Sequence, residues 1–288
     1  MKETAYLFQT TLIIGWWIGL ASSDHFFVAF QFPEIGAIAF WSFVAPDIVV
    51  IALLSLIRVY KASRALGLIV LGGFSYGTLY CICASCLTGG GYLSSTLMTV
   101  GVSFNLLICF DKQLFRTSSA NSVFFNGFKT LVQLICIWAI ALVIIPGVIM
   151  DAFGQIEFPK LSVNTLLGIG LFVLCSTLGV SSAMTMVMRG NGTPLPLDQT
   201  SRLVTSGPYR FVRNPMAIAG IGQGLSISLI FLSPPILVYS ILGAISWNWI
   251  VRSIEERDMM SRFGEAYRDY QENVDCWIPA FRQPKEND

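Results

Sequence analysis

The sequence predicts an all-α integral membrane protein with about eight transmembrane helices, and three observations support this prediction. Of the 288 residues, 54% are apolar and only 12% are charged, whereas about a quarter of the residues in a soluble domain carry charge. The mean hydropathy is +0.67. The chain also contains repeated apolar runs of about twenty residues, the length that crosses the hydrocarbon core of a bilayer.

These apolar runs give the expected elements in order. We expect spans at residues 5–22, 37–59, 65–87, 92–110, 129–149, 163–188, 214–232 and 235–252. The first run follows a mixed-charge start, Lys2 and Glu3, and no small-residue cleavage site succeeds it, so we interpret it as a retained span. The last two runs are joined by Ser233-Pro234-Pro235 and should form a tight helical hairpin, because proline ends one helix and opens the next.

The distribution of basic residues predicts the orientation of these spans. With the N-terminus in the cytoplasm, every one of the 18 Lys and Arg residues except Lys160 falls on the cytoplasmic side, Lys112 and Arg116 included. A six-span or seven-span arrangement would divide the basic residues between the two sides. We therefore expect both termini to be cytoplasmic, in a bacterial inner membrane or the endoplasmic reticulum. The net charge of +1 gives no indication of a nucleic-acid partner.

One polar loop interrupts the apolar pattern between spans six and seven. It reads TPLPLDQTSRLVTSGPYRFVRNPM and occupies residues 193–216. The polar tail that starts at Arg252 lies on the same side of the membrane in this topology. Loop and tail are therefore expected to form one cytosol-facing pocket.

The residues of loop and tail suggest what such a pocket would bind. The turn at 207–209 exposes backbone N–H groups beside an aromatic ring, and Asn214 precedes the positive end of a helix, with Arg213 next to it. Glu255 and Glu256 supply negative charge suited to an ammonium group or to ribose hydroxyls. Equally, arginines at span ends are commonly topology signals and an acidic pair is commonly a solvated helix face. These residues alone predict a polar pocket and no particular reaction.

Two motifs in this region resemble a known family. The stretches RLVTSGPYRFVRNPM and EERDMMSRFGEAYRDY resemble the isoprenylcysteine carboxyl methyltransferases and are similar to the related phospholipid N-methyltransferases, in particular to bacterial-type members. The family pattern is a Leu-Val-x-x-Gly-x-Tyr turn, Arg-His/Asn-Pro at a helix start, a helical hairpin, then Glu-Glu and Phe-Gly-x-x-Tyr. The resemblance extends from about Arg189 to Phe281. It divides the chain into a methyltransferase core at 126–288 and an N-terminal transmembrane region at 1–125 with no assigned role.

The resemblance implies an integral membrane methyltransferase that uses S-adenosylmethionine and no metal. Arg213 and Asn214 are the candidate catalytic residues, and Arg252 is the candidate substrate contact. The resemblance and the chemistry of the pocket together give nine expected cofactor contacts: Leu203, Val204, Gly207, Tyr209, Asn214, Pro215, Met216, Glu255 and Glu256.

One difference between this chain and the family pattern predicts the kind of molecule that accepts the methyl group. The prenylcysteine enzymes typically have His where this chain has Asn214, and the only histidine, His25, is expected on the outer side. Asn cannot act as a base near neutral pH. We therefore expect a lipophilic acceptor with a carboxylate or another reactive nucleophile. The alternatives are a phospholipid N-methyltransferase, an NADPH-dependent membrane reductase of the sterol type, and a small transporter.

Two further features allow a second interpretation. The cysteines in CICASC, residues 81–86, could suggest a metal or redox site, but two of them point to different helix faces, and small residues here favour close helix packing. Asp47 is the one acid inside an expected span, which is typical of functional sites. It follows Pro46, however, so it is also consistent with a kink or a helix start.

Overall fold

The structure is a computed structural model and describes residues 2–114, 122–194 and 198–279, without the side chains of 111–114. Within these ranges the chain is helical and contains no strand, only an isolated β-bridge between Thr193 and Gln199. This confirms the predicted all-α class. Arg116 and Phe281, and the side chain of Lys112, fall outside the described part, so the expectations that involve them are not addressed.

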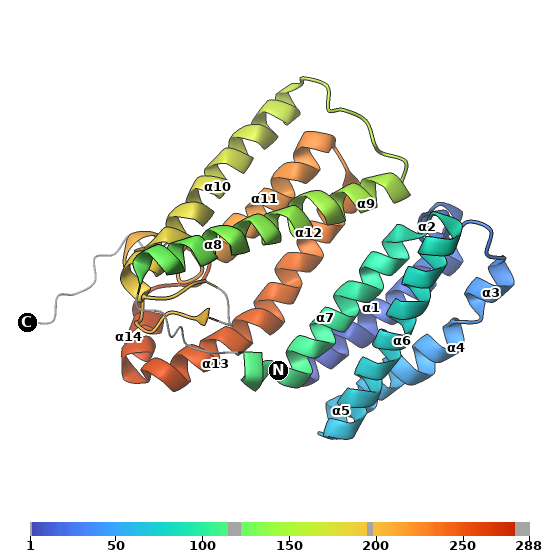
Figure 1. The fold of residues 1–288 in the computed structure, drawn as a ribbon, viewed down its shortest axis with the longest axis horizontal. Coiled ribbons are helices and arrows are strands. Elements are labelled where there is room, and N and C mark those ends of the chain that lie inside the picture. Colours follow the sequence, from blue (N-terminus) through green and yellow to red (C-terminus); the bar gives the residue numbers. More distant parts are fainter. Residues whose placement is uncertain (1, 115–121, 195–197, 280–288) are drawn as a thin grey trace, which may run out of the picture. The chain divides into compact units, whose positions relative to one another are not determined.

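The described residues form eighteen elements, which follow one another in the order of the sequence (Figure 1). They are α1 (Lys2–Ser22), α2 (Asp24–Phe30), α3 (Ala37–Trp41), α4 (Val44–Pro46), the π-helix η1 (Asp47–Leu53), α5 (Leu54–Tyr60), α6 (Arg64–Thr88), α7 (Tyr92–Leu114), α8 (Val123–Trp138), the π-helix η2 (Ala139–Ile144), α9 (Ile145–Ala152), α10 (Val163–Gly190), the 3₁₀ helix η4 (Gly207–Arg210), α11 (Pro215–Phe231), α12 (Pro234–Ser246), the π-helix η5 (Trp247–Val251), α13 (Arg252–Phe263) and α14 (Glu265–Asn273).

Seven helices of the described chain are long and apolar enough to cross a membrane. They correspond to seven of the eight expected spans, although the fifth runs on as Val123–Ala152 instead of 129–149. The remaining expected span is α11, an apolar helix of 17 residues. At about 1.5 Å per residue it is roughly 26 Å long, slightly less than a typical hydrocarbon core. The protein is therefore a multi-pass membrane protein, while the orientation of its termini stays a prediction.

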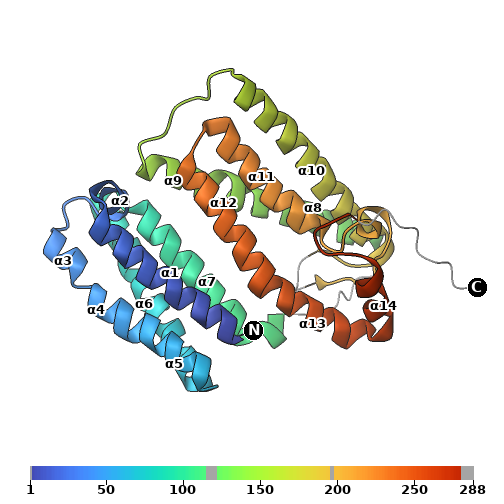
Figure 2. The ribbon, with the colours of Figure 1, turned by 180° about the vertical axis from the view of Figure 1, so that it is seen from behind.

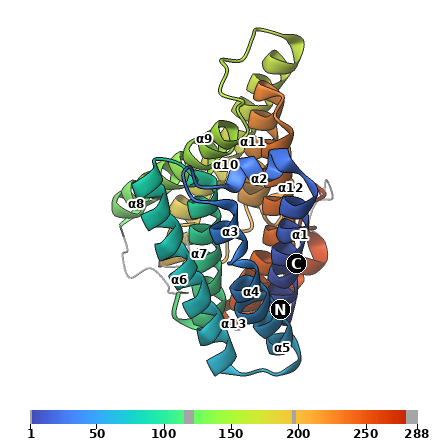
Figure 3. The same ribbon diagram turned by 90° about the vertical axis from the view of Figure 1, so that its right-hand side faces the viewer.

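The chain divides into two compact units, and the first contains Met1–Asp111 and Ile145–Ile156. The axes of its long helices are roughly aligned with one another (Figure 3). Buried polar groups join them: Gln9 donates to the Ser55 hydroxyl at 2.8 Å and accepts from Asn105 at 2.7 Å. Asp47 opens η1 and accepts a hydrogen bond from the Trp17 indole at 3.1 Å. Its side chain therefore joins two helices of this unit.

The second unit contains Lys112–Ile144 and Glu157–Asp288. In it α10 and α11 lie side by side (Figures 1 and 2). The two helices pack closely at Gly168, where an added Cβ would lie only 2.7 Å from the Ile230 side chain. Leu232 in the left-handed region and the cap Ser233 turn the chain into α12, which gives the predicted hairpin. The helix α12 continues through η5 into α13. Its apolar part ends at Val251, and the charged helix α13 extends beyond the span.

Candidate functional site

Arg213 joins the loop before α11 to the C-terminal tail. Its backbone N–H donates to the carbonyl of Asp275 at 2.9 Å, and its Nη1 donates to the carbonyls of Gln271 at 3.0 Å and Val274 at 2.6 Å. Its Nη2 donates to Oε1 of Glu256 at 3.1 Å. Arg213 therefore joins loop and tail in unit 2, and its guanidinium is mostly buried.

The turn that presents Tyr209 requires a glycine. Gly207 has φ 64°, and a Cβ there would lie 2.9 Å from the Thr185 hydroxyl. The following 3₁₀ turn buries the ring of Tyr209, whose exposed fraction is 3%. The carbonyl of Tyr209 accepts a hydrogen bond from the Tyr270 hydroxyl. Its own hydroxyl is buried and has no hydrogen-bond partner within the described residues.

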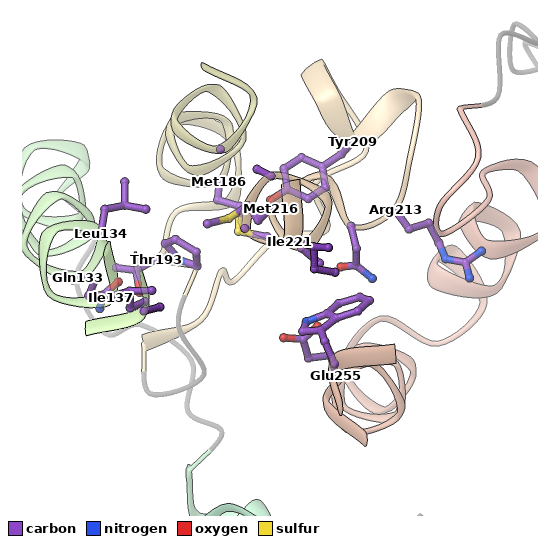
Figure 4. Close-up of a pocket in the computed structure, with 18 of the residues that line it drawn as sticks. Gln133, Leu134, Ile137, Met186, Thr193, Tyr209, Arg213, Met216, Ile221 and Glu255 are labelled. Atoms are coloured by element: carbon purple, nitrogen blue, oxygen red, sulfur yellow. The ribbon is translucent and has the colours of Figure 1, made fainter. Parts of the chain in front are cut away.

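A cavity of about 530 Å³ lies where these elements meet, entirely within unit 2. Figure 4 shows Gln133, Leu134 and Ile137 of α8 at one side of it and Tyr209, Arg213 and Glu255 at the other. Met186 of α10 and Met216 of α11 lie between the two sides (Figure 4). Residues of α12, such as Tyr239 and Gly243, complete an apolar wall. The volume falls within the range of about 300–1,000 Å³ that is usual for small-molecule sites.

Seven of the predicted site residues line this cavity: Val204, Tyr209, Arg213, Asn214, Met216, Glu255 and Glu256. Four others do not. Leu203 packs against Tyr267, Tyr270 and Val274 of the tail, whereas Gly207 shapes the turn and Pro215 begins α11 as a buried residue. Arg252 donates to Glu256 at 2.9 Å and to Asn248 at 3.2 Å. The roles assigned to these residues stay predictions.

Asn214 occupies the N-cap position of α11 without capping the helix through its side chain. Its Nδ2 donates instead to the sulfur of Cys276 at 3.6 Å, across to the tail. The carboxamide is thereby held at the cavity wall by a weak hydrogen bond.

The charges at this end of the cavity are largely paired. Glu256 accepts hydrogen bonds from both Arg213 and Arg252. Glu255 forms no ion pair with another described residue, and burial together with the neighbouring Glu256 carboxylate raises its pKa to about 7. Burial also raises the pKa of Tyr209 well above its ordinary value, so this side chain is a neutral phenol near pH 7. Glu255 is therefore the acid whose charge can respond to a ligand near neutral pH.

Several lining residues were missed in the sequence. Met259 and Arg262 follow Glu255 at helical spacings of four and seven, a signal that places them on one face of α13. Arg262 ties that helix to the loop, because its Nη1 donates to the Thr200 carbonyl at 2.7 Å. Tyr267 and Tyr270 belong to the motif that carries the resemblance, yet received no role.

Gln133 was missed for a different reason. It lies in α8, outside the stretch that carries the resemblance, and its only signal was a polar side chain within an apolar span.

The fold defines a multi-pass membrane protein whose second unit contains a cavity of the size that is usual for small-molecule sites. Residues 163–266 match the model of the phospholipid methyltransferase family. The match confirms the resemblance seen in the sequence, and it covers the helix α10, the polar loop, the helical hairpin and the charged helix α13. It supports a membrane methyltransferase. No curated protein and no solved structure gives a significant match to the chain.

Proposed function

We propose that the protein is an S-adenosylmethionine-dependent methyltransferase whose acceptor is a lipophilic molecule taken from the membrane. The observation that carries the proposal is the composition of one end of the cavity. There the buried Tyr209 hydroxyl and the buried Nε of Arg213 have no hydrogen-bond partners among the described residues, and the Glu255 carboxylate lines the same cavity. The family match adds methyl transfer to this picture and favours it over the reductase and transporter alternatives.

The cavity fits the chemical groups of this cofactor. Tyr209 and Arg213 would donate hydrogen bonds to the methionine carboxylate, and Glu255 would accept from its ammonium or from ribose hydroxyls. Met216 and Val204 would cover the apolar faces of the ligand. The bound cofactor would supply a methyl group on a sulfonium, which is a good leaving group. The residues would contribute by aligning the reactants and excluding water, effects that can supply roughly 7–11 kcal/mol.

The apolar part of the cavity supports a lipophilic acceptor. Leu134, Ile137, Trp138 and Leu142 of α8 and η2 line it, and residues of α12 face it. In a membrane protein, such a wall suits an acyl or prenyl chain, since the chain remains in apolar surroundings.

Thermal unfolding of the detergent-purified protein tests the proposal. S-adenosylhomocysteine should raise the unfolding temperature and NADPH should not, because only a ligand that binds the native state stabilises it. The Tyr209→Ala variant is the control for binding at this cavity and should lose the stabilisation. Stabilisation by NADPH alone would contradict the proposal and favour the reductase.

A further inference from the structure

The wall of the cavity formed by α12, η5 and α13 carries an aromatic ring that the proposed function does not use. Trp247, the first residue of the π-helix η5, lines the cavity. It follows Gly243 of α12 by four residues and precedes Glu255 of α13 by eight, and both of these residues also line the cavity. Residues spaced by four drift around an α-helix, which has about 3.6 residues per turn, and the wider π-helical turn reduces this drift. The π-helix therefore helps to keep Trp247 on the same side as Gly243 and Glu255.

The C-terminal tail holds the ring of Trp247 in place. The ring of Trp277 packs edge-on against it, with 5.2 Å between the ring centroids and 83° between the ring planes. Trp277 is itself fixed, because its Nε1 donates to Oδ1 of Asn248 at 2.9 Å, and the same oxygen accepts from Nη1 of Arg252 at 3.2 Å. A ring that is held before the ligand arrives loses little freedom on binding. Trp277 is thus in a position to orient Trp247 for a ligand.

Trp247 lies at the point of the cavity where methyl transfer would have to take place. In the proposed function, the polar end with Tyr209 and Glu255 holds the methionine part of the cofactor, and the apolar wall holds the acceptor. The sulfonium, its methyl group and the nucleophile must be aligned, so the sulfonium belongs where these two parts of the cavity meet. Gly243 is part of the apolar wall and Glu255 of the polar end. Trp247 lies between them along one continuous helix.

The other described aromatic residues of the cavity lining belong to one part or the other. Tyr209, Tyr267 and Tyr270 come from the loop and the tail, at the polar end. Trp138 and Tyr239 come from α8 and α12, in the apolar wall. The position between the two parts therefore favours Trp247 as the ring that meets the sulfonium.

The cavity offers little negative charge to a sulfonium at this point. Among the described residues that line it, the carboxylates are Glu255 and Glu256. Glu256 accepts hydrogen bonds from Arg213 and Arg252, and Glu255 is assigned to the ammonium group or the ribose. A cation without a partner in apolar surroundings is costly, and the face of an indole is the best aromatic partner for a cation. An indole at this point would therefore compensate the charge of the sulfonium.

We infer that Trp247 is a specificity-determining residue that binds the sulfonium of the cofactor through a cation–π interaction, and that Trp277 is the positioning residue for its ring. The inference rests on the proposed function, because it assumes that S-adenosylmethionine occupies the cavity. In the transfer, a lone pair of the nucleophile forms the bond to the methyl carbon, and the electron pair of the broken carbon–sulfur bond stays on sulfur as a neutral thioether. The cation–π interaction exists only before the transfer, so Trp247 favours binding of the cofactor and release of the product.

The ratio of two dissociation constants tests this inference. The full-length, detergent-purified protein is titrated calorimetrically with S-adenosylmethionine and with S-adenosylhomocysteine, in the absence of an acceptor. Trp247→Leu should weaken binding of S-adenosylmethionine about 3- to 30-fold more than binding of S-adenosylhomocysteine. Trp247→Phe keeps a weaker aromatic face, and its ratio should lie between those of the wild type and Trp247→Leu. Trp277→Leu should shift the ratio in the same direction by a smaller factor.

Trp249→Leu is the matched control. Trp249 belongs to the same π-helix, is 53% exposed and does not line the cavity, so this variant should keep the ratio of the wild type. An equal loss of affinity for both ligands in Trp247→Leu would show that the ring only fills space, and it would overturn the inference. If Trp247→Leu does not fold, a wild-type ratio in Trp247→Phe overturns it in the same way. If the wild-type protein binds neither ligand, the proposed function itself has failed.

Discussion

The hydroxyl of Tyr270 donates a hydrogen bond to the backbone carbonyl of Tyr209, while the Tyr209 hydroxyl has no hydrogen-bond partner among the described residues. Tyr270 of the tail thus holds the backbone of Tyr209 in the loop, and in the proposed function the Tyr209 hydroxyl binds the ligand. Both residues are buried, at 8% and 3% exposure. In this pair, Tyr270 has a structural role and Tyr209 has the proposed binding role.

The variants Tyr209→Phe and Tyr270→Phe should therefore affect different properties, the first ligand affinity and the second stability. Tyr209→Phe should weaken binding of S-adenosylhomocysteine about 5- to 10-fold and not lower the unfolding temperature, because its hydroxyl has no hydrogen-bond partner among the described residues. Tyr270→Phe leaves a buried carbonyl unpaired and should lower the unfolding temperature by about 2–4 °C. Calorimetric titration and thermal unfolding of both proteins check this. Equal loss of affinity and stability in Tyr209→Phe would contradict the assigned roles.

The pKa of Glu255 predicts how binding depends on pH. Its carboxyl is about half protonated near pH 7, and a cationic ligand favours the ionised form. The affinity for S-adenosylmethionine should therefore increase as the pH rises from 5.5 to 7.5, and the Glu255→Gln variant should show no such increase. Glu265→Gln, an exposed change in α14, is the matched control and should behave as the wild type. A pH-independent affinity in the wild type would contradict the prediction.

The same pKa predicts a change in stability with the opposite sign. Between pH 4.5, the ordinary pKa of this group, and about 7, the folded protein holds a proton that the unfolded chain has lost. The free energy of unfolding should therefore fall as the pH rises through this window. Glu255→Gln removes the effect, so the variant should unfold at a higher temperature than the wild type at pH 8 and at a similar temperature near pH 4.5. A variant less stable than the wild type at pH 8 would show that Glu255 stabilises the fold.

Lysine should not be able to replace Arg213, because the guanidinium binds several groups that lie in different directions. Lysine retains the charge but cannot reach Gln271, Val274 and Glu256 together. Arg213→Lys should lower the unfolding temperature and expose the loop to limited proteolysis. Arg210→Lys, an exposed arginine three residues earlier, is the matched control and should change neither measurement. Equal proteolysis of the two variants would show that Arg213 does not hold loop and tail together.

Gly207 provides a test of the turn itself. The Gly207→Ala variant places a Cβ at φ 64° and 2.9 Å from the Thr185 hydroxyl. We expect a loss of about 1–2 kcal/mol in the free energy of unfolding from the backbone conformation alone. Gly170→Ala, in α10 with nothing within 4 Å of the added Cβ, should be neutral or slightly stabilising. Similar stability of the two variants would contradict the described turn.

The sequence predicted the parts of the site that depend on local chemistry. Tyr209 and Asn214 were found because a glycine turn and an Asn-Pro helix start leave clear signals, and Glu255 because an acidic pair begins a charged helix. The spans followed from hydrophobic length. The fifth span is longer than expected, and α11 is shorter, since its 17 residues end at Phe231 before Leu232 in the left-handed conformation.

The remaining features depend on distant contacts. The guanidinium of Arg213 binds Glu256 and Val274, which lie 43 and 61 positions further along the chain, and such distant pairing leaves no local sequence pattern. Arg252 was assigned as a substrate contact from the family resemblance, but it does not line the cavity, and its guanidinium pairs with Glu256 and Asn248. Gln133 and Gln199 line the same cavity, and the ion pair between Lys129 and Asp198 joins α8 to the loop there.

Methyl transfer itself is the most direct measurement of the central claim. The purified protein is incubated with methyl-labelled S-adenosylmethionine and membrane lipid, and the organic phase is counted and compared with that of the Tyr209→Ala variant. The account predicts time-dependent label in lipid with the wild type and at least a tenfold lower rate with the variant, as expected from the loss of an aromatic contact and a hydrogen bond. The absence of label with the wild type, under conditions where NADPH but not S-adenosylhomocysteine stabilises the protein, would contradict it.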